Sequence, residues 1–518
     1  MIFFNNYNPG SMNVFNRLMK NAAALVLVLI TAGTAAAQKK HTAPNIIYIL
    51  ADDLGIGDVK LYNTNGKLRT PNIDRIGREG MRFDDVHSSS AVCTPSRYSI
   101  VTGRYAWRSR LAKGVLYGYD KPLIDSSRLT VARLLQQNGY ATACIGKWHL
   151  GLGWKVITPG KEPVIDYSSP ITGGPNALGF DYFYGIAASL DMPPFIFIEN
   201  DHTVGQPATV KKWGRKGPAA ADFEAVNCLP ELTSKAVAYI REKSQEQRPF
   251  FLYFTLPSPH TPIVPSAAFK GKSGVTEYGD YVMETDWAVG QLLKAVDEGK
   301  IAENTMIVFT SDNGFAPYVL KTWDVEARGH YPSMHYKGYK ADIWEGGHRI
   351  PFVVKWPGNV PPGSTSGHTV CLSDFMATVA GMLHKPLPDN AAEDSYNILP
   401  YLTGQSSGEI REATIHHSID GNFAIRQGKW KLELCPGSGG WAKPRNAEAF
   451  KQGLPVVQLY DLEADIGEQH NVQAEHPEVV KRLMALLQQY VNEGRSTPGK
   501  RQKNDTSVDL WKKVYATK

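Results

Sequence analysis

Polar residues able to bind a metal ion or move a proton follow each of four apolar stretches of the chain. These residues are Asp52 and Asp53, Lys147 and His149, His260, and Asp312 and Asn313. Taken singly, each is ordinary, because aspartates cap helices, Asp-Asn-Gly is a turn signal and a lone histidine is usually structural. Their shared placement predicts one site, because ligand crevices of open α/β sheets lie outside the carboxyl ends of the strands.

The donor types in this set indicate a hard metal ion. Three carboxylates and one amide are oxygen donors of the kind that Ca²⁺ and Mg²⁺ prefer, whereas zinc sites favour imidazole and thiolate. The amide of Asn313 also argues against a zinc-type phosphatase, which would want further nitrogen ligands. The donor types alone leave Ca²⁺ and Mg²⁺ both open.

A fifth element with chemical potential is the segment Ala91-Val-Cys-Thr-Pro-Ser-Arg97. Pro95 suits the first turn of a helix, which places Cys93 near the helix N-terminus. Free amides and the helix dipole favour an anion there, and the guanidinium of Arg97 suits sulfate or phosphate oxygens. The alternative is a small buried cysteine that merely precedes a helix.

The elements that must position these residues are strands and helices in alternation. The four apolar runs read as strands buried on both faces, as in a parallel sheet, at 45–51, 141–145, 250–256 and 305–310. Stretches with helical periodicity lie between them, including 129–137 and 285–298. This alternation predicts an α/β fold with a large, mostly parallel sheet flanked by helices.

Beyond about residue 400 the pattern changes to short strands and turns. Strands are predicted at 423–426, 430–434 and 456–461, and a helix at 477–493. They indicate a smaller α+β subdomain with a short antiparallel sheet and one covering helix. We accordingly divide the chain into a catalytic domain (42–400), a C-terminal subdomain (401–495) and a solvated tail (496–518).

The first 37 residues have the composition of a secretory signal. Arg17 and Lys20 precede the apolar run 22–30, and small residues fill 34–37. The run is shorter than the roughly 20 apolar residues that span a bilayer. We expect a cleaved signal peptide, a secreted or periplasmic protein and no stable membrane anchor.

Charge and cysteine content exclude several classes of protein. Removing residues 1–37 lowers the net charge only from +6 to +4, and no run of lysine or arginine suggests nucleic-acid binding. The five cysteines, an odd number, leave at least one free thiol, and none forms a C-x-x-C pair. Cys93 is the cysteine for which a separate role is expected.

These motifs together resemble one family. Cys93-Thr-Pro-Ser-Arg97 matches the C-x-P-x-R signature of the formylglycine-dependent sulfatases, which belong to the alkaline phosphatase superfamily. The resemblance covers residues 42–495 and includes Gly-Lys-Trp-His-Leu-Gly at 146–151, Pro-His-Thr-Pro at 259–262, Ser-Asp-Asn-Gly at 311–314, Glu-Gly-Gly at 345–347 and Leu-Tyr-Asp-Leu at 459–462. It implies an alkaline phosphatase-like fold and hydrolysis of sulfate monoesters.

The resemblance implies that a formylglycine-generating enzyme oxidises Cys93 to an aldehyde, which hydrates to a geminal diol. One hydroxyl then attacks sulfur and displaces the alcohol. The second hydroxyl loses its proton, and sulfate leaves by elimination as the aldehyde reforms. A serine ester would have no such exit.

The same resemblance assigns the metal ligands and the groups around the nucleophile. Asp52, Asp53, Asp312 and Asn313 match the calcium ligands, joined by the oxygen at position 93. The resemblance gives Arg97 the role of holding the modified residue. His149 matches the base for the second hydroxyl, with Lys147 beside it.

Three further residues are implied to contact the substrate. His260 matches the histidine that protonates the leaving oxygen. Lys340 matches a lysine that grips a sulfate oxygen and is preferred to Lys337. Ser189 matches a hydroxyl that contacts sulfate.

The expected substrate is a sulfated carbohydrate or an aryl sulfate. Two alternatives remain open from the sequence. One is a phosphomonoester or phosphodiester hydrolase on the same scaffold. The other is a non-catalytic glycan-binding protein, which would follow if Cys93 were never oxidised.

Overall fold

The four apolar stretches form adjacent parallel strands, as predicted. These strands are β1 (Asn45–Ala51), β4 (Ala141–Lys147), β12 (Phe250–Thr255) and β13 (Thr305–Ser311), and they lie side by side in the order β13-β1-β12-β4. All their residues are buried. Burial on both faces explains why these strands are almost uniformly apolar and show no alternation.

The central strands belong to a ten-stranded mixed sheet. Its order is β15 (Ser364–Ser366), β2 (Met81–Phe83), β14 (Phe352–Lys355), β13, β1, β12, β4, β7 (Tyr182–Ile186), β8 (Ile198–Glu199) and β9 (His202–Thr203). The strand pairs β13–β14, β14–β2, β7–β8 and β8–β9 are antiparallel, and the other pairs are parallel.

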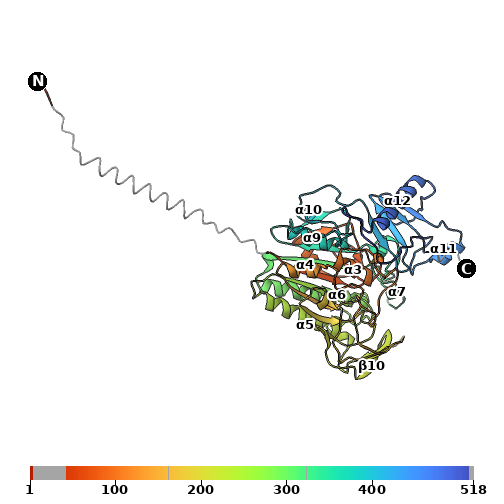
Figure 1. Cartoon of the computed structure of the whole chain (residues 1–518), viewed down its shortest axis with the longest axis horizontal. Coiled ribbons are helices and arrows are strands. Elements are labelled where there is room, and N and C mark those ends of the chain that lie inside the picture. Colours follow the sequence, from red (N-terminus) through yellow and green to blue (C-terminus); the bar gives the residue numbers. More distant parts are fainter. Residues whose placement is uncertain (4–42, 161–162, 323, 513–518) are drawn as a thin grey trace. The chain divides into compact units, whose positions relative to one another are not determined.

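Helices cover both faces of this sheet (Figure 1). On one face lie α2 (Pro71–Arg78), α5 (Ala225–Lys243) and α6 (Glu277–Glu298); on the other lie α3 (Cys93–Thr102), α4 (Val131–Gln137), α9 (Phe375–Met382) and α10 (Leu399–Leu402). The helix expected at 285–298 begins earlier, at Glu277, where the side chain of Thr276 accepts a hydrogen bond from the Gly279 amide and caps it.

A second sheet occupies the C-terminal part. It consists of the antiparallel strands β17 (Thr414–His417), β18 (Phe423–Gln427), β19 (Trp430–Glu433) and β20 (Gln458–Asp461), and α12 (Pro477–Glu493) packs on it. The predicted antiparallel sheet with its helix is confirmed, with β17 as an additional strand. The remaining elements are the pairs β3 (Val86–His87) with β16 (Val370–Cys371), β5 (Val156–Thr158) with β6 (Val164–Ile165) and β10 (Thr209–Trp213) with β11 (Arg215–Ala219), and the helices α7 (Tyr318–Thr322), α8 (Glu345–His348) and α11 (Asn446–Lys451).

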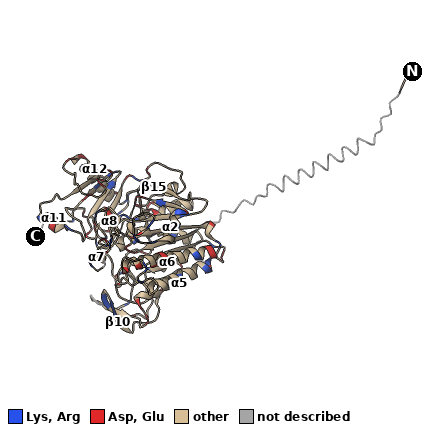
Figure 2. Cartoon of the chain, turned by 180° about the vertical axis from the view of Figure 1, so that it is seen from behind, with Lys and Arg blue, Asp and Glu red and all other residues tan. Residues whose placement is uncertain are grey.

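The computed structural model describes residues 1–3, 43–160, 163–322 and 324–512. Pro44–Lys518 forms one compact unit, which holds both the predicted catalytic domain and the predicted subdomain. The signal peptide expected at 1–37 lies outside the described residues apart from its first three. None of the helices in the described part of the chain combines the length and hydrophobicity needed to cross a bilayer. Figure 2 shows lysine and arginine interspersed with aspartate and glutamate on the viewed side.

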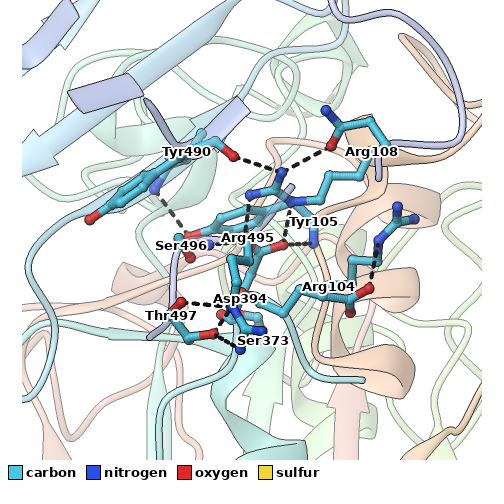
Figure 3. Close-up of polar contacts among 12 residues, drawn as sticks. Arg104, Tyr105, Arg108, Ser373, Asp394, Tyr490, Arg495, Ser496 and Thr497 are labelled. Carbon is cyan, nitrogen blue, oxygen red and sulfur yellow. Dashed lines mark hydrogen bonds and ion pairs between the residues drawn. The ribbon is translucent and has the colours of Figure 1, made fainter. Parts of the chain in front are cut away.

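The segment after Arg495 is largely exposed, but two of its residues contact buried arginines or their partners. The amide of Ser496 donates to Asp394 at 3.1 Å, and Asp394 also forms two 2.8 Å contacts with the guanidinium of Arg108 (Figure 3). Asp505 pairs with Arg104 at 3.0 Å. This part of the tail therefore closes over a buried ion pair.

Removing the Asp394 carboxylate should destabilise the fold strongly. Asp394 and Arg108 are both fully buried, and Asp394→Ala would leave Arg108 as an uncompensated charge. We expect the free energy of unfolding in urea to fall by about 3–5 kcal/mol. The control is Asp297→Ala, whose pair with Arg75 is exposed (43% and 37%) and should cost below about 1 kcal/mol. Equal losses in the two variants would contradict this account.

Candidate active site

Backbone hydrogen bonds join the carboxyl ends of three neighbouring strands. The amide of Asp52 donates to the Ser258 carbonyl at 3.0 Å, and the amide of Asp312 donates to the Ala51 carbonyl at 3.1 Å. The strands β1, β12 and β13 thereby deliver their last residues to one place. Asp53 has a φ of 65°, in the left-handed region that non-glycine residues rarely adopt outside constrained sites.

A cationic side chain pairs with each of the three carboxylates gathered at this edge. Lys147 Nζ lies 2.7 Å from Asp52 Oδ2 and Lys340 Nζ lies 2.7 Å from Asp53. Arg97 contacts Asp312 Oδ2 through Nε at 2.9 Å and Nη2 at 2.7 Å. All six side chains are at most 5% exposed, so each carboxylate needs its partner to offset the loss of hydration.

The charges shift the acidity of the three carboxyls in different directions. Burial alone would raise the pKa of Asp52 and Asp53, but Lys147 and Lys340 outweigh it and lower both. Burial raises the pKa of Asp312 to about 6, because Asp52 adds to the rise and Arg97 only partly opposes it. A bound cation would stabilise the ionised form of all three carboxylates.

The oxygen atoms of this cluster fit a hard cation. Asp52 Oδ1 and Asn313 Oδ1 are buried and have no hydrogen-bond partner among the described residues. Donor atoms of Asp52, Asp53, Cys93 and His260 lie within 4.8 Å of one another. Because buried polar atoms rarely stay unpaired, these free oxygens suit a metal ion bound between the strand ends.

Cys93 is the first residue of α3 and is 2% exposed. Burial raises the pKa of its thiol to about 12, although Lys147 and Lys340 act against the rise. An unmodified Cys93 would therefore remain a thiol at neutral pH and would be a poor nucleophile. Arg97 follows one helical turn later, on the same face, and also donates to the Lys147 carbonyl at 3.0 Å.

His149 is held in a form able to accept a proton. Its φ is 59°, and Nε2 lies 2.7 Å from the Leu116 carbonyl, so Nε2 carries the hydrogen. Nδ1 is buried without a partner among the described residues. Burial and the charges of Lys147 and Arg97 hold the pKa of His149 well below its usual value, which keeps the ring neutral.

His260 presents its other ring nitrogen to the cluster. Nδ1 lies 2.6 Å from the Thr261 carbonyl and Nε2 lies 3.6 Å from Asp53 Oδ2. The backbone bond thus fixes the ring and turns Nε2 toward the cluster. Asp191 Oδ1 lies 4.0 Å from Nδ1 and adds negative charge behind the ring. No motif in the sequence indicated this residue.

Of the three remaining predicted residues, Ser189 and Lys340 lie near the strand ends, and Lys337 does not reach the carboxylates. Ser189 follows β7, which pairs with β4, and its buried Oγ has no partner among the described residues. Lys340 reaches Asp53, whereas Lys337 donates to the Glu468 carbonyl at 2.7 Å. Lys340 is accordingly the lysine of the cluster.

Tyr318 is a site residue that sequence reasoning missed. Its hydroxyl donates to Asp53 Oδ2 at 2.6 Å, and Lys340 Nζ lies 5.8 Å from the ring centre. Its position shortly after Asp312-Asn313-Gly314 was the available signal. Gly314 itself is required by close packing, since a Cβ there would lie 1.9 Å from the Gly346 carbonyl oxygen.

Comparison with known proteins identifies the family. The sequence model described as Sulfatase matches residues 44–385. The chain belongs to the sulfatase family. It is 34% identical to an N-acetylgalactosamine-6-O-sulfatase of Bacteroides thetaiotaomicron, over 91% of this chain and 99% of that protein. It is 32% identical to human arylsulfatase A, over 89% of each chain.

Solved structures agree with this assignment. One, from work on the metabolism of multiple glycosaminoglycans by Bacteroides thetaiotaomicron, superposes with a TM-score of 0.78 at 34% identity and covers 86% of this sulfatase and 99% of that chain. A phosphonate monoester hydrolase of Agrobacterium radiobacter shares the fold alone, with a TM-score of 0.55 at 19% identity over 86% and 96% of the two chains.

Calcium should stabilise this sulfatase through the free oxygens of the cluster. We expect a chelator to lower the melting temperature by about 2 °C or more and Ca²⁺ to restore it. Asn313→Ala should abolish the calcium-dependent shift, whereas Asn359→Ala, at an exposed turn, should preserve it. Stoichiometric zinc in a metal analysis of the purified protein would contradict the assignment.

Proposed function

We propose that this sulfatase is a calcium-dependent carbohydrate sulfatase that uses Cys93 after its oxidation to formylglycine. The observation that carries the proposal is the position of Cys93. It begins α3 within 4.8 Å of the carboxylate donors, yet its buried thiol has a raised pKa. Cys93 is thus close enough to the cluster to act as its nucleophile, but its thiol is too weakly ionised to do so unmodified.

The residues of the site would hold both a calcium ion and the modified residue at position 93. Asp52, Asp53, Asp312 and Asn313 would bind Ca²⁺, which polarises a sulfate ester and favours an ionised nucleophile. A hydrated aldehyde at position 93 would supply one hydroxyl to attack sulfur, displacing the alcohol, and a second whose deprotonation would release sulfate by elimination. Arg97, one turn along α3, pairs with Asp312 and would neutralise charge beside position 93.

The two histidines suit proton transfers in opposite directions. His149, neutral and with a free Nδ1, is prepared to take a proton from a hydroxyl at position 93. His260, with Nδ1 fixed on a backbone carbonyl and Nε2 3.6 Å from Asp53 Oδ2, would pass a proton from Nε2 to the departing alcohol oxygen when its ring is protonated. Lys147 and Lys340 supply positive charge to sulfate oxygens, and the Ser189 hydroxyl supplies a hydrogen bond.

The proposed substrate is a sulfated hexosamine or a related sulfated sugar. Support comes from the N-acetylgalactosamine-6-O-sulfatase, which this chain covers almost completely at 34% identity. Aryl sulfates would serve as activated substrates on the same sulfate pocket.

The proposed enzyme would be exported and modified before it becomes active. Export through the signal at 1–37 would place the enzyme in the periplasm or outside the cell, without a stable membrane anchor. A formylglycine-generating enzyme is the required partner before folding buries Cys93. No nucleic acid is involved.

Release of sulfate from 6-O-sulfated N-acetylgalactosamine tests the function. We expect the enzyme, produced together with a formylglycine-generating enzyme, to release sulfate, and Cys93→Ser to lose about 10³-fold or more of that rate because serine offers no second hydroxyl. Cys371→Ser, which alters a buried thiol not assigned to the cluster, should keep the rate. Faster hydrolysis of the corresponding phosphate ester would favour a phosphohydrolase instead.

A further inference from the structure

Three aromatic rings lead away from the Asp53 side of the site. The ring centres of His260 and Tyr318 are 6.1 Å apart, and those of Tyr318 and Trp441 are also 6.1 Å apart, with planes tilted by 51°. His260 is buried, whereas Tyr318 and Trp441 are both partly exposed. We call His260, Tyr318 and Trp441 the aromatic wall.

Trp441 reaches the wall from the C-terminal part of the chain. It lies in the loop 438–444, which joins β19 to α11. The loop is closed by a bond from the Ser438 amide to the Pro444 carbonyl at 3.0 Å. Its Ser438 carbonyl accepts from the Ile343 amide at 2.7 Å, which ties the loop to the segment that carries Lys340.

Asp342 fixes Trp441 relative to Lys340. Its Oδ1 accepts from the amides of Trp441 at 2.8 Å and Ala442 at 3.0 Å, and its Oδ2 accepts from the Tyr339 amide at 2.9 Å. The Asp342 side chain is fully buried. One carboxylate therefore holds together two loops that lie 99 residues apart in the sequence.

The two loops touch backbone to backbone at this point. A Cβ at Gly440 would lie 2.3 Å from the Ala341 carbonyl oxygen, so only glycine allows the approach. Ala341, which follows Lys340, thus packs against Gly440, which precedes Trp441. This arrangement leaves the backbone of Trp441 little freedom to move relative to the backbone of Lys340.

We propose that Trp441 recognises the sugar that carries the sulfate, and that Asp342 is the residue that positions it. The inference rests on the proposed function and extends it to a recognition residue. With the ester oxygen at His260, the rest of the substrate must extend past that histidine, where the aromatic wall lies. The broad indole face suits the apolar C–H face of a pyranose ring. The ligand class is therefore a sulfated pyranoside.

Binding to a protein that cannot turn over tests this directly. In a Cys93→Ala background, calorimetry with 6-O-sulfated N-acetylgalactosamine should show Trp441→Ala weakening binding by about 10- to 100-fold, as for a buried aromatic anchor. Trp441→Phe should recover most of the loss. The affinity for inorganic sulfate should stay within about twofold, because sulfate does not reach the indole.

A matched tryptophan controls for general destabilisation. Trp287 is also partly exposed and meets Phe269 at the same 6.1 Å, with a similar tilt of 58°, on the helix α6. Trp287→Ala should leave sugar binding unchanged. Asp342→Ala should weaken sugar binding more than sulfate binding, because it removes the acceptor that holds the Trp441 and Ala442 amides. A merely structural defect would weaken both equally.

The outcomes separate this inference from the proposed function. The role of Trp441 is overturned if Trp441→Ala binds the sugar as tightly as its Cys93→Ala parent, or if that parent does not bind the sugar at all. Either result holds whatever the wild-type enzyme hydrolyses. Indole-dependent sugar binding by a wild-type protein that releases no sulfate upholds Trp441 and overturns the proposed reaction.

Discussion

The structure depends on the cost of burying three carboxylates at one edge of a sheet. Asp52, Asp53 and Asp312 would repel one another strongly in so small a volume, and each has lost its hydration. Lys147, Lys340 and Arg97 offset that cost, and each comes from a different part of the chain. The site therefore forms only when the sheet, α3 and the loop before α8 are assembled together.

The C-terminal part completes this assembly. Glu468 accepts from the Glu345 amide at 2.7 Å, and its own carbonyl accepts from Lys337, so it holds the segment on both sides of Lys340. Asp342 joins the same segment to the loop of Trp441. In our account, the strands of the large sheet position the reacting groups. The C-terminal part fixes the segment of Lys340 through Glu468 and presents Trp441 to the sugar.

Features that depend on residues close together in the sequence could be predicted, whereas features that depend on residues far apart in the sequence could not. The buried parallel strands were evident from continuous apolar runs, and the site from polar residues at their ends. Strand β17 was missed because its His416 and His417 are polar yet buried by tertiary contacts. The tail was expected in solvent because Lys500, Arg501 and Lys503 are charged, but nothing local reveals that Ser496 and Asp505 close over buried arginines.

Tyr318, Asp191 and Asp342 escaped prediction for the same reason, since their partners are remote in sequence. What remains central is the chemical state of Cys93, which the burial of its thiol makes decisive. The most direct measurement is the mass of the tryptic peptide 83–97 from enzyme made with a formylglycine-generating enzyme. The account predicts the mass of an aldehyde or its hydrate at position 93. An unmodified thiol in a preparation that releases sulfate at its full rate would contradict it.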